Sequence, residues 1–237
     1  MPIKRIAKLI KRSAARVRRR RRPPEFAPRL VLFDFDGTLA DTMFIGGEAF
    51  NKFAEQFGYR KAVLEDLPAV REMTVPQVLS HYHIPITKLP KIAKCITGEL
   101  NKRMGDVAIF DGLREVLFEL RGRGFALGLL TSNSEANVKV FLDKYDLQIF
   151  SFIHCGSKLL GKARIIRGMI RRAGFEKHEA LVIGDEVRDI EAAKKAGVRC
   201  AAVAWGYNSP EALHRFKPDF FFETAADITR CLASYTP

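Results

Sequence analysis

Short apolar runs alternate with helix-patterned segments along most of the chain, and this alternation restricts the possible folds more than any other feature. Strand-like runs lie at 30–33, 125–130, 152–154, 180–183, 200–204 and 220–222. Helical patterns lie between the later runs, at about 113–121, 135–145, 162–173, 188–196 and 209–215. Strands joined by helices run parallel and bury both faces of their sheet, so the pattern predicts an α/β fold with a doubly wound parallel sheet.

One long segment interrupts this alternation. Residues 44–106 are mostly helical in pattern, are broken at four prolines and contain no convincing strand. We therefore expect residues 29–43 and 107–237 to form the α/β core, and residues 44–106 to form a helical subdomain inserted after the first strand. Ligands of such sheets bind beyond the carboxyl ends of the strands, so the functional residues are sought there.

The first strand runs into an acidic loop, Asp34-Phe35-Asp36-Gly37-Thr38. Asp34 and Asp36 are two residues apart on an extended segment, so their carboxylates point the same way, and Gly37 permits a sharp turn. Two like charges so close are unfavourable unless a cation lies between them or one is protonated. The loop therefore predicts a cation site.

Polar residues also follow two later strands. Thr131, Ser132 and Asn133 come after residues 127–130, where hydroxyl and amide donors at the start of a helix could bind an anion or simply cap the helix. Gly184-Asp185-Glu186 follows residues 181–183, and Asp189 comes one helical turn later. Several converging carboxylates favour a hard cation such as Mg²⁺.

A phosphate ligand would also need a positive charge near these carboxylates. Lys162 opens the helix that follows the run at 152–154 and could reach the same edge of the sheet, and Lys158 lies close to it in sequence. The intervening segment therefore adds a candidate phosphate-binding residue, Lys162.

These clusters together resemble the motifs of the haloacid dehalogenase (HAD) superfamily over residues 29–237. Asp34-Phe35-Asp36-Gly37-Thr38 is similar to the first motif, Thr131 to the second, Lys162 to the third, and Gly184-Asp185 with Asp189 to the fourth. The insertion resembles the small helical cap of the family. The segments 205–207 and 160–166 resemble its phosphoglycolate phosphatase-like branch. The resemblance implies a Rossmann-like core and a Mg²⁺-dependent phosphatase of a small phosphorylated metabolite.

The resemblance also implies roles for individual residues. Asp34 would attack phosphorus and form an aspartyl-phosphate, while Asp36 would act as general acid and then as general base. The expected Mg²⁺ ligands are the carboxylate of Asp34, the carbonyl oxygen of Asp36 and Asp185. The expected residues behind these ligands are Asp189, Glu186 and Thr38. The expected phosphate-binding residues are Thr131, Ser132, Asn133 and Lys162.

Two other functions stay open as alternatives. Asp36 favours phosphate esters over dehalogenation, because a carbon–halogen bond needs no protonated leaving oxygen. A sugar-phosphate mutase is one alternative, although Ile45-Gly46-Gly47 stands where such a mutase carries a cap histidine. The other is a binding or regulatory module with a HAD body, associated with a nucleic acid or a membrane.

The net charge of +13 is concentrated at one end of the chain. Residues 1–22 contain eleven basic side chains and no acidic one, which leaves 29 basic and 27 acidic residues elsewhere. We expect residues 1–28 to be a basic extension with a proline-rich linker, which could bind anionic lipid or nucleic acid or direct the chain to an organelle. Four scattered cysteines and no apolar run of ~18 residues predict a cytoplasmic chain without a transmembrane helix.

Overall fold

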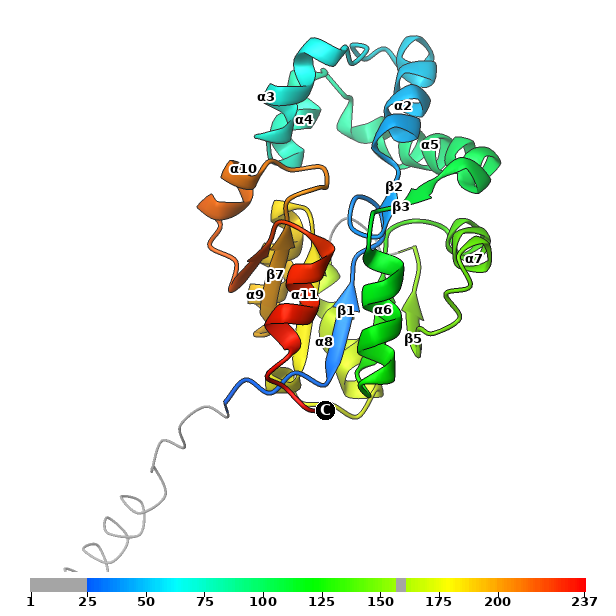
Figure 1. Cartoon of the computed structure of the whole chain (residues 1–237). Coiled ribbons are helices and arrows are strands. Elements are labelled where there is room, and N and C mark those ends of the chain that lie inside the picture. The colour runs from blue at the N-terminus through cyan, green and yellow to red at the C-terminus, as the bar shows by residue number, and fades with distance from the viewer. Residues whose placement is uncertain (1–24, 157–160) are drawn as a thin grey trace, which may run out of the picture.

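Six parallel strands form one sheet in the order β5-β4-β1-β6-β7-β8 (Figure 1). The computed structural model describes residues 25–156 and 161–237. The strands are β1 Leu30–Phe33, β4 Ala126–Leu130, β5 Phe152–His154, β6 Ala180–Gly184, β7 Arg199–Val203 and β8 Phe220–Phe222. The predicted α/β fold is confirmed, and each predicted strand is present.

Helices cover both faces of this sheet because successive side chains of a strand point to opposite sides. Leu30 and Leu32 of β1 belong to one apolar cluster, and Val31 and Phe33 belong to the other. The helices packed on the Val31 side are α6 Leu113–Gly122, α7 Glu135–Lys144 and α11 Ala225–Leu232. The helices packed on the Leu30 side are α8 Lys162–Arg172, α9 Val187–Ala196 and α10 Pro210–Arg215. Of these six helices, only α11 was not predicted.

A short two-stranded ribbon joins the sheet to the helical insertion. Strands β2 Ala40–Asp41 and β3 Ala108–Ile109 pair antiparallel, and the insertion lies between them in sequence. The insertion (residues 43–106) contains α2 Met43–Phe57, η1 Leu64–Asp66, α3 Leu67–Arg71, α4 Val75–His81, η2 Ile86–Lys88, α5 Leu89–Arg103 and η3 Met104–Asp106. One more 3₁₀ helix, η4 Lys177–Glu179, precedes β6. Sequence reasoning missed both strands of the ribbon.

The insertion has an apolar cluster of its own. Its buried members are Ala54, Phe57, Tyr59, Tyr82, Ile84 and Ile92. In Figure 1 the insertion lies beyond the ends of the strands at the top of the molecule. A separate apolar core supports the predicted division into an α/β core and a helical cap. The exact bounds of the cap, residues 44 and 106, stay a prediction.

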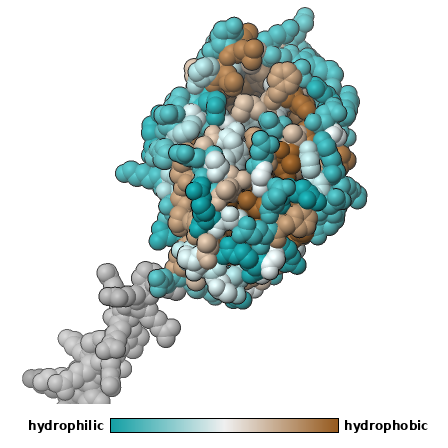
Figure 2. Space-filling model, viewed as in Figure 1, coloured by the Kyte–Doolittle hydropathy of each residue, from teal (hydrophilic) through white to brown (hydrophobic). Residues whose placement is uncertain are grey.

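The surface, the helix lengths and the chain ends add four facts. Most of the visible surface is hydrophilic, and apolar side chains gather mainly over the insertion (Figure 2), where Leu64 and Ile86 are about three-quarters exposed. Phe26 packs on Phe220 and Tyr235, so the packed body begins earlier than the expected Arg29. Among the described residues, no helix is both long and apolar enough to cross a membrane. The basic residues 1–22 lie outside the described part of the chain.

Two valines of α7 provide a test of the predicted core. Val138 is 2% exposed and belongs to the main apolar cluster, whereas Val140 on the same helix is 43% exposed. Val138→Ala should lower the free energy of unfolding by about 1.5–3 kcal/mol, through lost burial and a cavity. Val140→Ala should leave it unchanged or raise it slightly, because alanine favours a helix. Urea unfolding measures both values, and equal losses would contradict this packing.

Candidate active site

The central strand β1 delivers the first acidic residue to the middle of the sheet edge. β1 lies between β4 and β6, and the backbone N–H of Asp34 continues the β6 ladder by donating to the carbonyl of Ile183 at 2.8 Å. The chain then turns sharply at Gly37, whose φ is +78°. A Cβ on Gly37 would lie 2.2 Å from the Asp185 carboxylate, so a larger side chain would displace that group.

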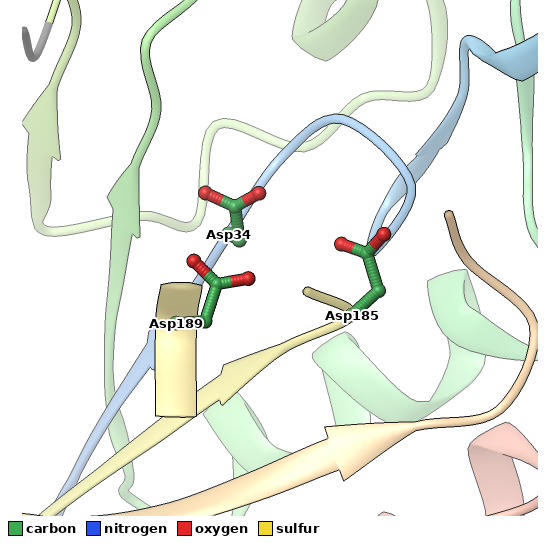
Figure 3. A group of neighbouring side chains, drawn as sticks. All are labelled: Asp34, Asp185 and Asp189. Atoms are coloured by element: carbon green, nitrogen blue, oxygen red, sulfur yellow. The ribbon is translucent and has the colours of Figure 1, made fainter. Parts of the chain in front are cut away.

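Three carboxylates, from two loops and one helix, meet at this edge. The side chains of Asp34, Asp185 and Asp189 point toward one shared space (Figure 3), and each offers an oxygen within 4.8 Å of the others. Asp34 is 4% exposed, and Asp185 and Asp189 are equally well buried. The Nζ atom of Lys162, at the start of α8, lies 2.5 Å from both Asp34 Oδ1 and Asp189 Oδ1. The structure thus brings together four residues that the sequence singled out.

Neutral hydrogen-bond donors hold the Asp185 carboxylate in position. Its two carboxylate oxygens accept hydrogen bonds of 2.7 Å, one from the Thr38 hydroxyl and one from the backbone N–H of Tyr207. Gly206 packs so closely that a Cβ there would lie 2.2 Å from the Cβ of Asp185. No ion pair to Asp185 occurs within residues 25–156 and 161–237. This acid is therefore fixed in position, and no basic side chain of the described residues pairs with it.

Burial and the neighbouring charges together shift the pKa values of these acids. Burial raises the pKa of Asp34 to about 7, although Lys162 opposes the shift. Burial, together with the charges of Glu186 and Asp189, raises the pKa of Asp185 well above its ordinary value. Burial opposes ionisation of Asp189 as well, but Lys162 and Arg188 outweigh it and lower the pKa. Of these three acids, only Asp189 has a lowered pKa, because on it the two cations outweigh burial.

The balance of charge in this group fits a divalent cation. Asp34, Asp185, Asp189 and Glu186 bring four acids, and the two bases that act on them are Lys162 and Arg188. Arg188 donates to Glu186 Oε1 from Nη2 at 2.5 Å. Clustered carboxylate oxygens are the donors that Mg²⁺ prefers, and the deficit of positive charge is what a dication would supply. The residues present therefore fit a magnesium site.

Asp36 lies in a different environment from Asp34. Its carboxylate accepts hydrogen bonds from the hydroxyl groups of Thr42 at 3.1 Å and Thr131 at 3.3 Å, and from the amide of Asn133 at 2.9 Å. All three donors are neutral. Burial raises the pKa of Asp36, and these hydrogen bonds oppose the shift only in part. Asp36 is thus disposed to carry a proton.

The neighbouring polar residues that follow β4 make different contacts. Thr131 and Asn133 contact Asp36, whereas the cap of α7 is Ser134, whose hydroxyl accepts from the N–H of Asn137. Ser132 is exposed and makes no side-chain hydrogen bond to any described residue. Ser134 therefore caps the helix, and anion binding by Thr131, Ser132 and Asn133 stays a prediction.

Sequence reasoning missed several contributors to the site. Thr42 bonds Asp36, and the Tyr207 hydroxyl lies 2.9 Å from the Thr42 hydroxyl. Asn137 donates to the Asn133 side chain at 2.7 Å and so orients its amide. The half-buried Arg188 adds a second cation beside these acids. Arg188 carried a sequence signal as a basic residue within the acidic motif, and Tyr207 lies in the segment 205–207 that resembles the family. Thr42 and Asn137 act through contacts that spacing does not reveal. Lys158 lies outside the described residues.

Comparisons with known proteins agree with this geometry. The family described as haloacid dehalogenase-like hydrolase matches residues 31–203. A phosphoglycolate phosphatase of Synechococcus elongatus is 30% identical over 203 residues, which are 85% of this chain and 96% of that protein. Phosphoglycolate phosphatase 1 of Pseudomonas aeruginosa is 26% identical over 86% of this chain and 79% of its own length.

Solved structures share the fold. A predicted phosphatase from Clostridium acetobutylicum has a TM-score of 0.75 at 22% identity, covering 87% of this chain and 99% of that one. CbbY from Rhodobacter sphaeroides, solved in complex with phosphate, has a TM-score of 0.68 at 22% identity, covering 85% and 96%. At this identity the likeness establishes the fold.

Replacing Asp185 tests the cost of the uncompensated charge. In metal-free solution near pH 7, Asp185→Asn should raise the free energy of unfolding by about 1–3 kcal/mol, because an amide is cheaper to bury than a carboxylate. Because its pKa is raised in the folded state, the unfolded chain ionises Asp185 at lower pH. Wild-type stability therefore falls as pH rises above the ordinary value of 3.8, and the gain in the variant should shrink toward pH 4.

Urea unfolding with a chelator at both pH values measures this effect. Asp219→Asn is the matched control, because Asp219 pairs with Arg199 and its pKa is lowered by a backbone N–H and that guanidinium, although burial opposes the shift. Asp219→Asn should be neutral or destabilising near pH 7. A destabilising effect of Asp185→Asn at both pH values would contradict the electrostatic interpretation.

Proposed function

Because this chain belongs to the haloacid dehalogenase-like hydrolase family and is a phosphatase of that family, we propose that it is a Mg²⁺-dependent phosphoglycolate phosphatase-like enzyme that acts through an aspartyl-phosphate. The observation that carries the proposal is the contrast between Asp34 and Asp36. Asp34 pairs with the Lys162 ammonium at 2.5 Å, whereas the hydrogen-bond donors to Asp36 among the described residues are neutral hydroxyl and amide groups. A nucleophile needs a neighbour that favours its ionised form and a proton donor does not, so the two surroundings suit the two roles.

In the proposed reaction, Asp34 attacks phosphorus and displaces the alcohol of the substrate. The bond from phosphorus to the ester oxygen breaks as the bond to Asp34 forms, and Asp36 gives its proton to the departing oxygen. Asp36 then accepts a proton from the water that attacks the aspartyl-phosphate, which releases inorganic phosphate and restores Asp34. The general acid and the general base are thus the same residue.

The neighbouring residues would bind and neutralise the phosphoryl group. Lys162, Thr131, Ser132 and Asn133 stand at the ends of the central strands and would hold its oxygens. Asp34 and Asp185 would hold Mg²⁺ with the carbonyl oxygen of Asp36, and the residues behind them would be Asp189, Glu186 and Thr38. When bound, the ion supplies positive charge to the transferring phosphoryl group.

The helical insertion would act as a cap over this site. Its separate core and its two-strand connection to the sheet support movement as a unit. Asp34 is 4% exposed, so a phosphate ester can reach it only if part of the surrounding structure moves. Closure of the cap would then exclude bulk water during the attack on phosphorus.

Phosphate release from a panel of small phosphorylated metabolites with Mg²⁺ tests the proposal. Phosphoglycolate is expected to be among the best substrates, and Asp34→Asn is expected to abolish turnover. Asp36→Asn should cost about 10²–10⁴-fold with phosphoglycolate, but far less with p-nitrophenyl phosphate, whose leaving group needs no proton. The measurements are kcat/KM for both substrates and mass spectrometry of the trapped aspartyl-phosphate in Asp36→Asn.

Asp41→Asn is the matched control, because Asp41 lies near both acids in sequence but is exposed on β2. It should retain wild-type kcat/KM. Transfer of phosphate between positions of a sugar phosphate, without release, would favour the mutase alternative. Turnover of phosphoglycolate by Asp34→Asn would contradict the covalent mechanism.

The basic residues 1–22 are proposed to bind a polyanion separately from catalysis. They hold eleven basic side chains and no acid, while the rest of the chain is nearly neutral. Deletion of residues 1–22 should leave kcat/KM unchanged and should abolish salt-sensitive binding to vesicles of anionic lipid or to nucleic acid. Vesicle sedimentation and filter binding at two salt concentrations measure this, and loss of turnover on deletion would contradict the separation.

A further inference from the structure

One arginine of the insertion donates hydrogen bonds to the core loop that follows β7 (residues 204–207). Arg71, the last residue of α3, donates from Nη2 to the carbonyl oxygens of Ala204 at 3.4 Å and Gly206 at 3.1 Å. Its Nε atom donates to the carbonyl oxygen of Tyr207 at 3.3 Å. The planar guanidinium with its several donors suits such a set of carbonyls, whereas an ammonium group would not match it.

The 204–207 loop lies directly against Asp185. The backbone N–H of Tyr207 donates to Asp185 Oδ2 at 2.7 Å. Gly206 lies so close to Asp185 that even a Cβ at this position would overlap it. A small displacement of the loop would therefore move this carboxylate or remove its hydrogen bond.

A second connection joins the same part of the insertion to the start of α9. The Asn208 amide donates to the carbonyl oxygens of Arg71 at 2.9 Å and Met73 at 3.0 Å. Its side-chain oxygen accepts from the backbone N–H of Val187 at 2.9 Å, two residues after Asp185. Asp185 is thus held between two segments that both depend on residues 71–73.

We propose that Arg71 is a positioning residue that couples docking of the insertion to the metal site. With the insertion docked, Arg71 holds the 204–207 loop so that Asp185 is correctly placed to bind a divalent cation. With the insertion displaced, these bonds are lost and the affinity for the cation falls. The proposal rests on the magnesium site of the proposed function.

The burial of the site gives this coupling a role in turnover. Asp34 is almost completely enclosed, and the insertion lies beyond the strand ends on its two-strand connection (Figure 1). Substrate entry that displaces the insertion would break the Arg71 bonds, and closure would restore them. The complete metal site would then form only when the substrate is enclosed. The aspartyl-phosphate step would therefore not begin while the site is open and Asp185 is displaced.

Metal binding to the full chain tests the coupling without using turnover. We expect Arg71→Ala to raise the dissociation constant for Mn²⁺, measured by isothermal titration, by about tenfold or more, as for other residues that support metal ligands. Arg71→Lys should recover little of this loss, because one ammonium cannot bond three carbonyls in this arrangement. Far-UV circular dichroism and urea unfolding with a chelator report whether the variants are folded.

Arg60→Ala is the matched control. Arg60 is also an insertion arginine, but its ion pair with Asp66 lies within the insertion, at 2.6 Å. It should bind Mn²⁺ with wild-type affinity. An Arg71→Ala dissociation constant within about twofold of wild type, or an equal loss in Arg60→Ala, would overturn the coupling while leaving the proposed phosphatase intact. A folded wild type that binds no Mn²⁺ would overturn both the coupling and the proposed metal site.

Discussion

Carboxylates that are buried together repel one another, and three of them are buried together beside the carboxyl ends of the central strands. Asp34, Asp185 and Asp189 offer oxygens within 4.8 Å of one another, and Lys162 bridges two of them. Such crowding is possible because no side chain occupies position 184 or 206, where a Cβ would overlap Asp189 or Asp185. A divalent cation at these carboxylates would relieve the repulsion, so in the proposed metal site cation binding would also stabilise the fold.

Local pattern was enough to predict the sheet, because its strands are buried on both faces and read as continuous apolar runs. It also placed the candidate residues at strand ends, and the structure brings these ends together because β1 lies between β4 and β6. The two-residue strands of the ribbon were not predictable. Ala40–Asp41 and Ala108–Ile109 are too short to show a period, and they exist only because each finds the other.

The residues that tune the site were hidden for a related reason. Thr42 and Tyr207 are 165 positions apart, and their shared hydrogen bond has no counterpart in local spacing. Arg71 likewise meets carbonyl oxygens more than 130 positions away, which any residue type could supply. Sequence patterns report which side chains are buried, whereas backbone carbonyls acquire a partner only once the tertiary fold brings one. The contacts that would support the proposed metal site are therefore the part that needs the structure.

The two aspartates of the first motif show how one short loop can supply opposite chemistry. Burial raises the pKa of Asp34 to about 7 although the carboxylate faces Lys162, and a dication at the same carboxylate would lower that pKa. Asp36 turns toward Thr42, Thr131 and Asn133, whose neutral dipoles do not cancel the burial that raises its pKa. In the proposed mechanism, the ion would favour the ionised form of Asp34, which the attack on phosphorus requires. The raised pKa of Asp36 suits the residue that would protonate the leaving oxygen.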